Sequence, residues 1–149
     1  MKKFVFFLIF AFAASLFNAQ TIDREIINNN EVFTGKIENS ATINVSFKSV
    51  TVENKALEIY KVSGCSDVEG SKADFEGTIT LNPEKTKKAA DKLVKIYDLK
   101  LFEKGTDKHN GILTGELKVK NLSEKNQLRF EGSWENYGNT LKFPFYFNN

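Results

Sequence analysis

Phe130-Glu131-Gly132-Ser133-Trp134 is the stretch of sequence that decides the fold. It places a glycine midway between two apolar residues and fills the positions between them with polar ones. The same pattern recurs three times, at residues 33–37, 75–79 and 113–117. Successive side chains of a strand point to opposite faces, so the glycine and the apolar residues share one face. Each copy therefore predicts a strand with one dry and one wet face.

The four glycines of these motifs predict a strongly curved sheet. A glycine inside a strand costs stability and usually marks tight curvature or a close approach of another group. Repeated glycines on the inner face suit a coiled sheet that closes into a barrel. Closure also removes the exposed edges that the strands would otherwise present.

Period-2 alternation of apolar and polar residues predicts eight strands. Their expected ranges are 32–38, 41–49, 56–62, 73–81, 96–103, 111–120, 127–135 and 139–147. The short, turn-rich connections favour antiparallel hairpins. We therefore predict one all-β domain over residues 32–149, an eight-stranded antiparallel up-and-down barrel of lipocalin-like shape.

A short helix is expected between the fourth and fifth strands. Asn82 is a favourable capping residue, and Pro83 follows at the first helical position. The apolar face would carry Ala89, Ala90, Leu93 and Val94, and another face would carry Lys85, Lys88, Lys92 and Lys95. Such a lysine stripe is either a solvated surface or a site for an acidic partner.

The N-terminus has the pattern of a bacterial secretory signal peptide. Lys2 and Lys3 precede an apolar run over residues 4–17, which is shorter than a membrane-spanning helix needs. We predict a signal peptide over 1–19, followed by a polar lead-in over 20–31. Cleavage after Ser15 and an uncleaved N-terminal anchor are the alternatives. The mature protein would be periplasmic or secreted, with no stable membrane span.

Removal of residues 1–19 changes the charge of the chain. The full sequence has 21 basic and 19 acidic residues, and two of the basic ones lie in the signal peptide. A neutral mature chain has no general attraction for nucleic acid or an acidic membrane. Cys65 is the only cysteine, so no intrachain disulfide can form, and we expect a monomer. We place Cys65 in a turn, where it is either a half-buried or idle cysteine, or one that forms an intermolecular disulfide or acts as a redox-sensitive thiol.

The strand order resembles a family of exported bacterial proteins that are predicted to be small barrels of the lipocalin or calycin type. The resemblance rests on Gly132-Ser133-Trp134 and on the run 99–103 followed by Gly111 and Gly115. It covers most of residues 32–147. In lipocalins the Gly-x-Trp motif lies on the first strand, whereas here it lies on the seventh. The resemblance implies a barrel and no particular activity.

The aromatic interior is the first candidate binding site. The residues expected to line it are Phe33, Phe75, Phe130, Trp134, Phe143 and Phe145. The space beside the glycines would then form an apolar ligand cavity. In the alternative, the rings fill that space and the core is solid.

Glu103 and Lys61 form the second candidate site. Glu103 lies at the same alternate positions of its strand as Leu99 and Leu101, so its side chain should point inward. An inward carboxylate needs a hydrogen-bonding partner or water. Lys61 shares the parity of Ile59 and could provide that partner at the barrel mouth. The pair would orient the polar head group of a ligand. In the alternative, Glu103 lies at a solvated strand end or forms a purely structural ion pair. We expect Glu103→Ala to affect ligand binding more than stability.

No catalytic, metal or cofactor motif stands out in the sequence. His109 is the only histidine and lies in an expected loop, so a conventional zinc site would need carboxylates. The sequence favours a binding protein over an enzyme, with no cofactor. The first hypothesis is a carrier or sensor for a small hydrophobic or amphipathic molecule. The second is a protein-interaction module, such as an inhibitor or envelope accessory, and the third is an enzyme that uses the barrel mouth.

Overall fold

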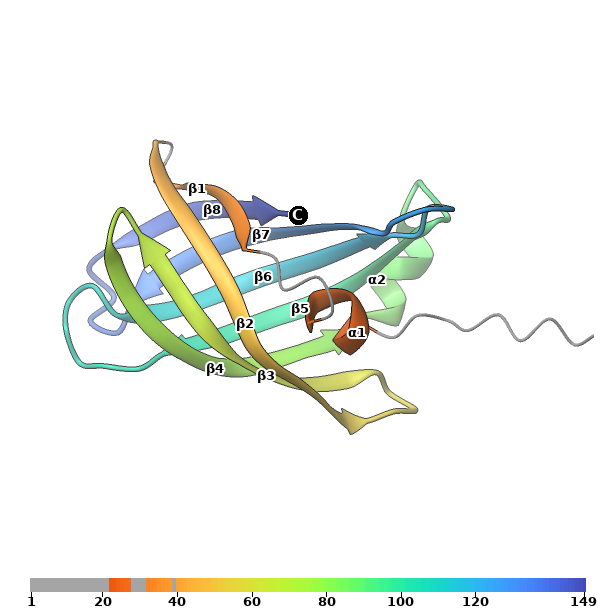
Figure 1. Ribbon diagram of the computed structural model, residues 1–149, viewed down its shortest axis with the longest axis horizontal. Coiled ribbons are helices and arrows are strands. Elements are labelled where there is room, and N and C mark those ends of the chain that lie inside the picture. The colour runs from red at the N-terminus through yellow and green to blue at the C-terminus, as the bar shows by residue number, and fades with distance from the viewer. Residues whose placement is uncertain (1–21, 28–31, 39) are drawn as a thin grey trace, which may run out of the picture.

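A computed structural model describes residues 22–27, 32–38 and 40–149. Eight antiparallel strands follow one another around a closed barrel, and the first strand pairs with the last (Figure 1). One short helix lies between the fourth and fifth strands. The predicted eight-stranded barrel and its helix are thus confirmed. The predicted signal peptide lies outside the described residues.

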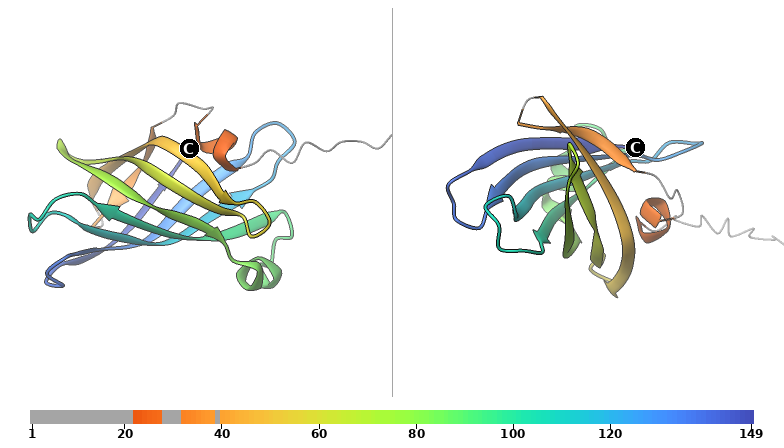
Figure 2. Two further views of the ribbon diagram at one scale, coloured as in Figure 1. Left: turned by 90° about the horizontal axis from the view of Figure 1, so that it is seen from below. Right: turned by 60° about the vertical axis from the view of Figure 1, so that its left-hand side comes forward.

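Seven connections join the strands in chain order. The elements are α1 (Ile22–Ile27), β1 (Phe33–Ile37), β2 (Ala41–Asn54), β3 (Ile59–Val68), β4 (Ser71–Leu81), α2 (Pro83–Lys88), β5 (Val94–Glu103), β6 (Gly111–Lys120), β7 (Gln127–Asn136) and β8 (Lys142–Asn148). The β3–β4, β5–β6 and β7–β8 connections gather at one end of the barrel, at the left of Figure 1. Both helices and the β2–β3 and β6–β7 connections lie toward the other end (Figures 1 and 2).

The structure corrects the second and third strands. β2 continues to Asn54, and the turn that follows it ends at Glu58, which has a positive φ of 47°. β3 then runs through residues 63–68, which the sequence pattern assigned to a turn. These small residues pair with both neighbouring strands, and Gly64 leaves room for the ring of Phe75. Cys65 is therefore half-buried in a strand.

The shift of β3 also reverses the predicted orientation of Lys61. Tyr60 and Val62 face the interior, each 4% exposed, so Lys61 between them points outward. Its ammonium lies 2.9 Å from the carboxylate of Glu53 on β2. The prediction that Lys61 points into the barrel is therefore wrong. Leu57 lies in the turn before β3 and is 60% exposed, so the apolar series that suggested an inward Lys61 does not belong to the strand.

The motif glycines lie where neighbouring strands come closest. Gly115 and Gly132 face each other across β6 and β7. A Cβ atom on Gly132 would lie only 2.6 Å from the Cα of Gly115, well inside van der Waals contact. Gly35 and Gly77 are equally close to the backbones of β8 and β5. The absence of side chains at these positions allows the sheet to curve into a barrel.

Aromatic rings fill the middle of the barrel. Phe33, Phe75, Phe130 and Phe147 are each no more than 1% exposed. Phe130 stacks on Phe147 with ring centroids 4.7 Å apart and meets Phe33 edge-on at 5.2 Å. Phe47, on β2, contacts Phe33, Phe75 and Phe130 at 5.6–5.7 Å. The rings thus form a continuous packed layer, as the solid-core alternative predicted.

Helix α1 belongs to the folded unit, although it falls within the predicted polar lead-in. Ile22 and Ile26 are 4% and 2% exposed and join the hydrophobic core beside β2. At this end of the barrel, the Tyr97 hydroxyl donates to Glu58 at 2.6 Å, and Lys95 donates to the same carboxylate at 2.9 Å. Residues of the lead-in therefore contribute to the core at this end.

Helix α2 is shorter than the amphipathic pattern suggested. It ends at Lys88, and Ala89 leaves the helical conformation with a ψ of 134°. The chain has to rejoin the sheet at Val94, which pairs with Lys120. Lys95 therefore lies on β5 and not on the helix. The predicted lysine stripe along one helix does not form.

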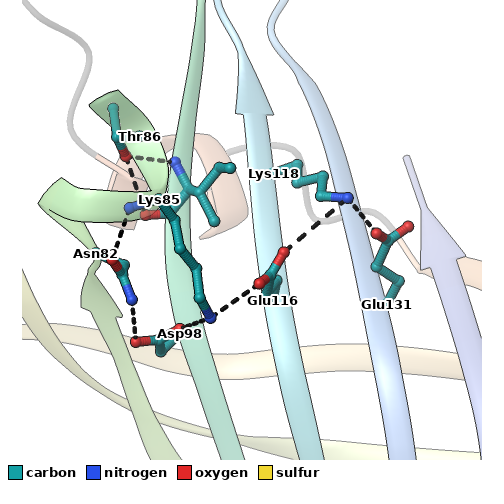
Figure 3. A network of polar contacts seen from close by, with 8 residues as sticks. Asn82, Lys85, Thr86, Asp98, Glu116, Lys118 and Glu131 are labelled. Carbon is teal, nitrogen blue, oxygen red and sulfur yellow. Dashed lines mark hydrogen bonds and ion pairs between the residues drawn. The ribbon is translucent and has the colours of Figure 1, made fainter. Parts of the chain in front are cut away.

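A ladder of charged side chains joins α2 to the outer face of the sheet (Figure 3). Lys85 lies 2.7 Å from Asp98 on β5 and 2.9 Å from Glu116 on β6. Lys118 continues the ladder from Glu116 to Glu131 on β7. Each positive charge thus bridges carboxylates of different elements, and the ladder fastens the helix to three neighbouring strands.

Acidification is expected to weaken this ladder. The hydrogen bond from Lys118 holds the pKa of Glu131 below its ordinary value of 4.5. Burial raises the pKa of Asp98, but the hydrogen bonds from Lys85 and Asn82 outweigh it and leave the pKa below 3.8. A carboxylate whose pKa is lower in the folded state adds stability above its unfolded pKa and loses it as the pH falls. We therefore expect the free energy of unfolding to fall once the pH drops below about 4.5.

Urea unfolding between about pH 7 and pH 3 measures this loss. The double variant Asp98→Asn/Glu131→Gln should show a shallower decline than the wild type. Glu84→Gln is the control, because Glu84 is 80% exposed and its ion pair with Lys88 is 4.0 Å long. If the double variant and the wild type lose stability in parallel, the ladder is not the cause.

Candidate functional site

An open cavity of about 470 Å³ occupies the end of the barrel opposite α1. We call it the end cup. Its apolar wall comprises Ile37, Ala41, Ile43, Val68, Ala73, Trp134 and Phe143. Its polar groups belong to Glu38, Ser66, Ser71, Lys72, Glu103, Asp107, His109 and Asn110. Together these residues come from seven of the eight strands, all but β6, and from the loops at this end, so the end cup depends on the barrel being closed.

Glu103 lies in the end cup and is only 6% exposed. One carboxylate oxygen accepts the hydroxyl of Ser66 at 2.6 Å. The other accepts the indole N–H of Trp134 at 2.9 Å and the amide of Gly111 at 3.0 Å. The three donors belong to β3, β7 and β6, whereas Glu103 ends β5. The carboxylate therefore connects strands on both sides of the barrel.

Trp134 and Phe143 form the aromatic part of the wall. Their rings are parallel within 4°, and the centroids are 5.9 Å apart. Trp134 is 6% exposed, and its indole nitrogen is held by Glu103. Because one edge of the indole is fixed by a hydrogen bond and one face by stacking, the ring has a defined position beside the carboxylate.

Hydrogen bonds from the β7–β8 turn hold the β5–β6 loop at the rim of the end cup. The Asn136 amide group donates to the carbonyl of Lys108 at 3.2 Å, and the Tyr137 hydroxyl donates to the carbonyl of Glu103 at 2.6 Å. The Asp107 carboxylate accepts the backbone amide of His109 at 3.0 Å. These bonds fix the β5–β6 loop, so Asp107 and His109 have defined places at the rim.

The electrostatic character of the end cup is negative. Glu38, Glu103 and Asp107 contribute three carboxylates, against one ammonium from Lys72. Burial and the nearby negative charge of Glu103 raise the pKa of the Tyr137 hydroxyl above its ordinary value. The end cup therefore combines an apolar wall with excess negative charge.

The structure brings only some of the predicted site residues together. Glu103, Trp134 and Phe143 line the end cup, and His109 lies at its rim. The inward orientation predicted for Glu103 is confirmed. The others lie elsewhere: Phe33, Phe75 and Phe130 form the packed layer, Phe145 stacks on Phe147 at 5.5 Å, and Lys61 is on the outer surface.

Ser66 is the polar residue that sequence reasoning missed. It is 2% exposed and donates to Glu103, but the surrounding Ser63-Gly64-Cys65-Ser66-Asp67 was interpreted as a turn. The alternation of Tyr60, Val62, Gly64, Ser66 and Val68 was a signal for an inward-facing series. Gly64 and Ser66 concealed this two-residue alternation, because alternation is usually recognised from large apolar residues.

Glu103→Ala is expected to lower stability as well as to alter the end cup. The substitution leaves the buried N–H groups of Trp134 and Gly111 without their acceptor. Each unsatisfied buried donor costs roughly 1–3 kcal/mol, so we expect the two to lower the free energy of unfolding by at least about 2 kcal/mol. Urea unfolding followed by Trp134 fluorescence measures it. Glu135→Ala is the control, since Glu135 is 40% exposed on the outer face. Equal stabilities of the two variants would contradict a bridging role for Glu103.

Comparison with known protein families, with curated proteins and with solved structures gave no significant match. The resemblance to lipocalin-like barrels therefore stays a prediction from the sequence. Within residues 22–27, 32–38 and 40–149, no helix is long and apolar enough to cross a membrane. Over the same residues, no three His, Cys, Asp or Glu side chains are grouped as a metal site requires.

Proposed function

We propose that this protein binds a small amphipathic organic molecule in the end cup. The observation that carries the proposal is an open cavity of about 470 Å³ with an apolar wall and one buried carboxylate. Ligand sites are typically about 300–1,000 Å³, mostly apolar, with a few well-placed polar groups. The packed phenylalanine layer supports binding at the end of the barrel and not at its centre.

The proposed place of action is outside the cytoplasm, in the periplasm or the medium. This part rests on the sequence, in which Lys2 and Lys3 precede an apolar run over residues 4–17. A carrier or sensor for a small molecule fits such a location. An interaction module is the alternative, and the same experiment distinguishes it.

Native mass spectrometry of protein purified from its own host tests the proposal. We expect a co-purified mass of a few hundred daltons, the size that such a volume accommodates. Ala73→Phe places a ring in the wall of the end cup and should abolish the adduct. Thr78→Phe is the matched control, because Thr78 lies on the same strand but faces the outer surface.

Two results would count against a small-molecule carrier. A co-purified polypeptide would support the interaction module instead. An adduct that persists in Ala73→Phe would show that the molecule binds elsewhere on the protein.

A further inference from the structure

Glu103 is a buried negative charge without a positive partner among the described side chains. Its contacts are the hydroxyl of Ser66, the amide of Gly111 and the indole of Trp134, all of them neutral donors. The amide and the indole can only donate, whereas the Ser66 hydroxyl has a single hydrogen and also lies 3.3 Å from the carbonyl oxygen of Ala73. The hydrogen bonds satisfy the oxygens and leave the charge itself uncompensated.

Two other partly buried carboxylates of the barrel have positive partners. Glu58 lies 2.9 Å from the ammonium of Lys95, and Glu116 lies 2.9 Å from that of Lys85. Both are more exposed than Glu103. Burial without a counter-charge is costly, because low-dielectric surroundings do not screen the charge. Glu103 differs from these pairs in facing a cavity large enough for a ligand.

The wall beside Glu103 suits the apolar part of a cationic ligand. The N–H edge of the Trp134 indole points at the carboxylate, with the nitrogen 2.9 Å away, and Phe143 is stacked parallel to the indole. An ammonium group that pairs with Glu103 therefore lies beside the edge of the indole, and the rest of the molecule can pack against aromatic surface. Ile43 and Val68 provide apolar contact for the rest of the molecule.

The rim charges favour the same kind of ligand. Of the ionisable groups that line the end cup, Glu38 and Asp107 add negative charge. Lys72 is the positive exception, and its ammonium lies 4.0 Å from the carboxylate of Asp67. This excess of negative charge attracts cations and repels anions.

We infer that the end cup selects an organic cation, an amine with an apolar substituent. Its ammonium group pairs with Glu103, and its substituent packs against Trp134 and Phe143. The inference rests on the proposed function and narrows it to one class of ligand.

Three probes with one phenylbutyl skeleton test the inference: 4-phenylbutylamine, 4-phenylbutan-1-ol and 4-phenylbutanoate. They differ in the charge of the head group, so differences in affinity report on charge. Trp134 is the only tryptophan, and its fluorescence reports binding directly. Calorimetry provides the dissociation constants. We expect the amine to bind at least about tenfold more tightly than the alcohol, and the acid most weakly.

Glu103→Gln removes the charge at nearly constant volume. We expect the amine to lose its advantage over the alcohol in this variant. Glu135→Gln is the matched control, because Glu135 follows Trp134 in sequence but pairs with Lys142 on the outer face. It should retain the wild-type preference. If Glu103→Gln does not fold, the ratio of amine to alcohol affinity in the wild-type protein decides by itself.

The outcomes separate this inference from the proposed function. Equal affinities for the amine and the alcohol would overturn the cation preference and leave a ligand-binding cup intact. A preference that survives in folded Glu103→Gln would exclude Glu103 as its source and overturn the inference. Failure of all three probes to bind would overturn the inference, whereas the proposed function is decided by native mass spectrometry of protein from its own host.

Discussion

Replacement of Phe130 by alanine is expected to lower the free energy of unfolding by about 3–5 kcal/mol, the usual loss for a buried phenylalanine. Phe130 is fully buried and has ring contacts with Phe33, Phe47 and Phe147 at 4.7–5.6 Å. Its removal leaves a cavity in the middle of the packed layer, where the barrel backbone cannot collapse to fill it. Domains of this size are stable by only about 5–15 kcal/mol, so much of the total would be lost.

Phe102→Ala is the matched control for this prediction. Phe102 lies on β5 with 41% of its surface exposed, and its ring contacts the ammonium of Lys100. The same chemical change there should cost less than about 1 kcal/mol, as is usual for surface positions. Urea unfolding followed by Trp134 fluorescence compares the two variants. A small loss for Phe130→Ala would mean that the middle of the barrel is loosely packed.

The packed layer explains how both sequence-based alternatives for the interior can hold in part. The rings of Phe33, Phe75 and Phe130 make the centre solid, as the solid-core alternative requires. At one end of the barrel the wall continues as Trp134 and Phe143, which line the end cup. The prediction of an apolar cavity therefore holds at that end.

The barrel itself was predictable from the sequence because its signal is repeated. Four copies of the glycine motif and a consistent period of two identify the strands, and β6 was predicted to the residue. The predicted range of β3 was displaced toward the N-terminus because the strand's inward positions include Gly64 and Ser66, which gave no apolar signal. Their side chains are small for packing reasons that involve Phe75 and Glu103 on other strands. The sequence shows the alternation at these positions but not the distant partners that require small side chains there.

The candidate site was only partly predictable. Glu103, Trp134 and Phe143 were expected to face inward from parity alone, and they do. Parity says which face a side chain occupies but not its height along the barrel. It therefore placed Phe33 and Trp134 in one cavity, although one lies in the packed layer and the other in the end cup. The heights depend on strand stagger, which hydrogen-bond register sets and composition does not reveal.

Replacement of Gly132 by alanine is expected to disrupt closure of the barrel. The added methyl group would lie 2.6 Å from the Cα of Gly115 and closer still to the carbonyl oxygen of Thr114. Both obstacles are backbone atoms of β6, so no side-chain rotation can relieve the contact. Overpacking usually costs about 1–3 kcal/mol where side chains can adjust. Here we expect a loss of about 3 kcal/mol or more, because two paired strands have to separate.

Gly138→Ala provides the matched control for the closure prediction. Gly138 lies in the β7–β8 turn, and an added methyl group would meet its nearest neighbours, in Asn136 and Thr140, at 3.9 Å. This is ordinary contact, so the variant should be neutral or gain about 0.4–1 kcal/mol from a less flexible unfolded chain. Urea unfolding measures both variants, and hydrogen exchange of the β6 and β7 amides shows where pairing is lost. If Gly132→Ala is as stable as Gly138→Ala, close approach of the strands is not what the motif glycines provide. If Gly132→Ala loses hydrogen-exchange protection only at the β6 and β7 amides, the motif glycines are what allows neighbouring strands to approach and the barrel to close.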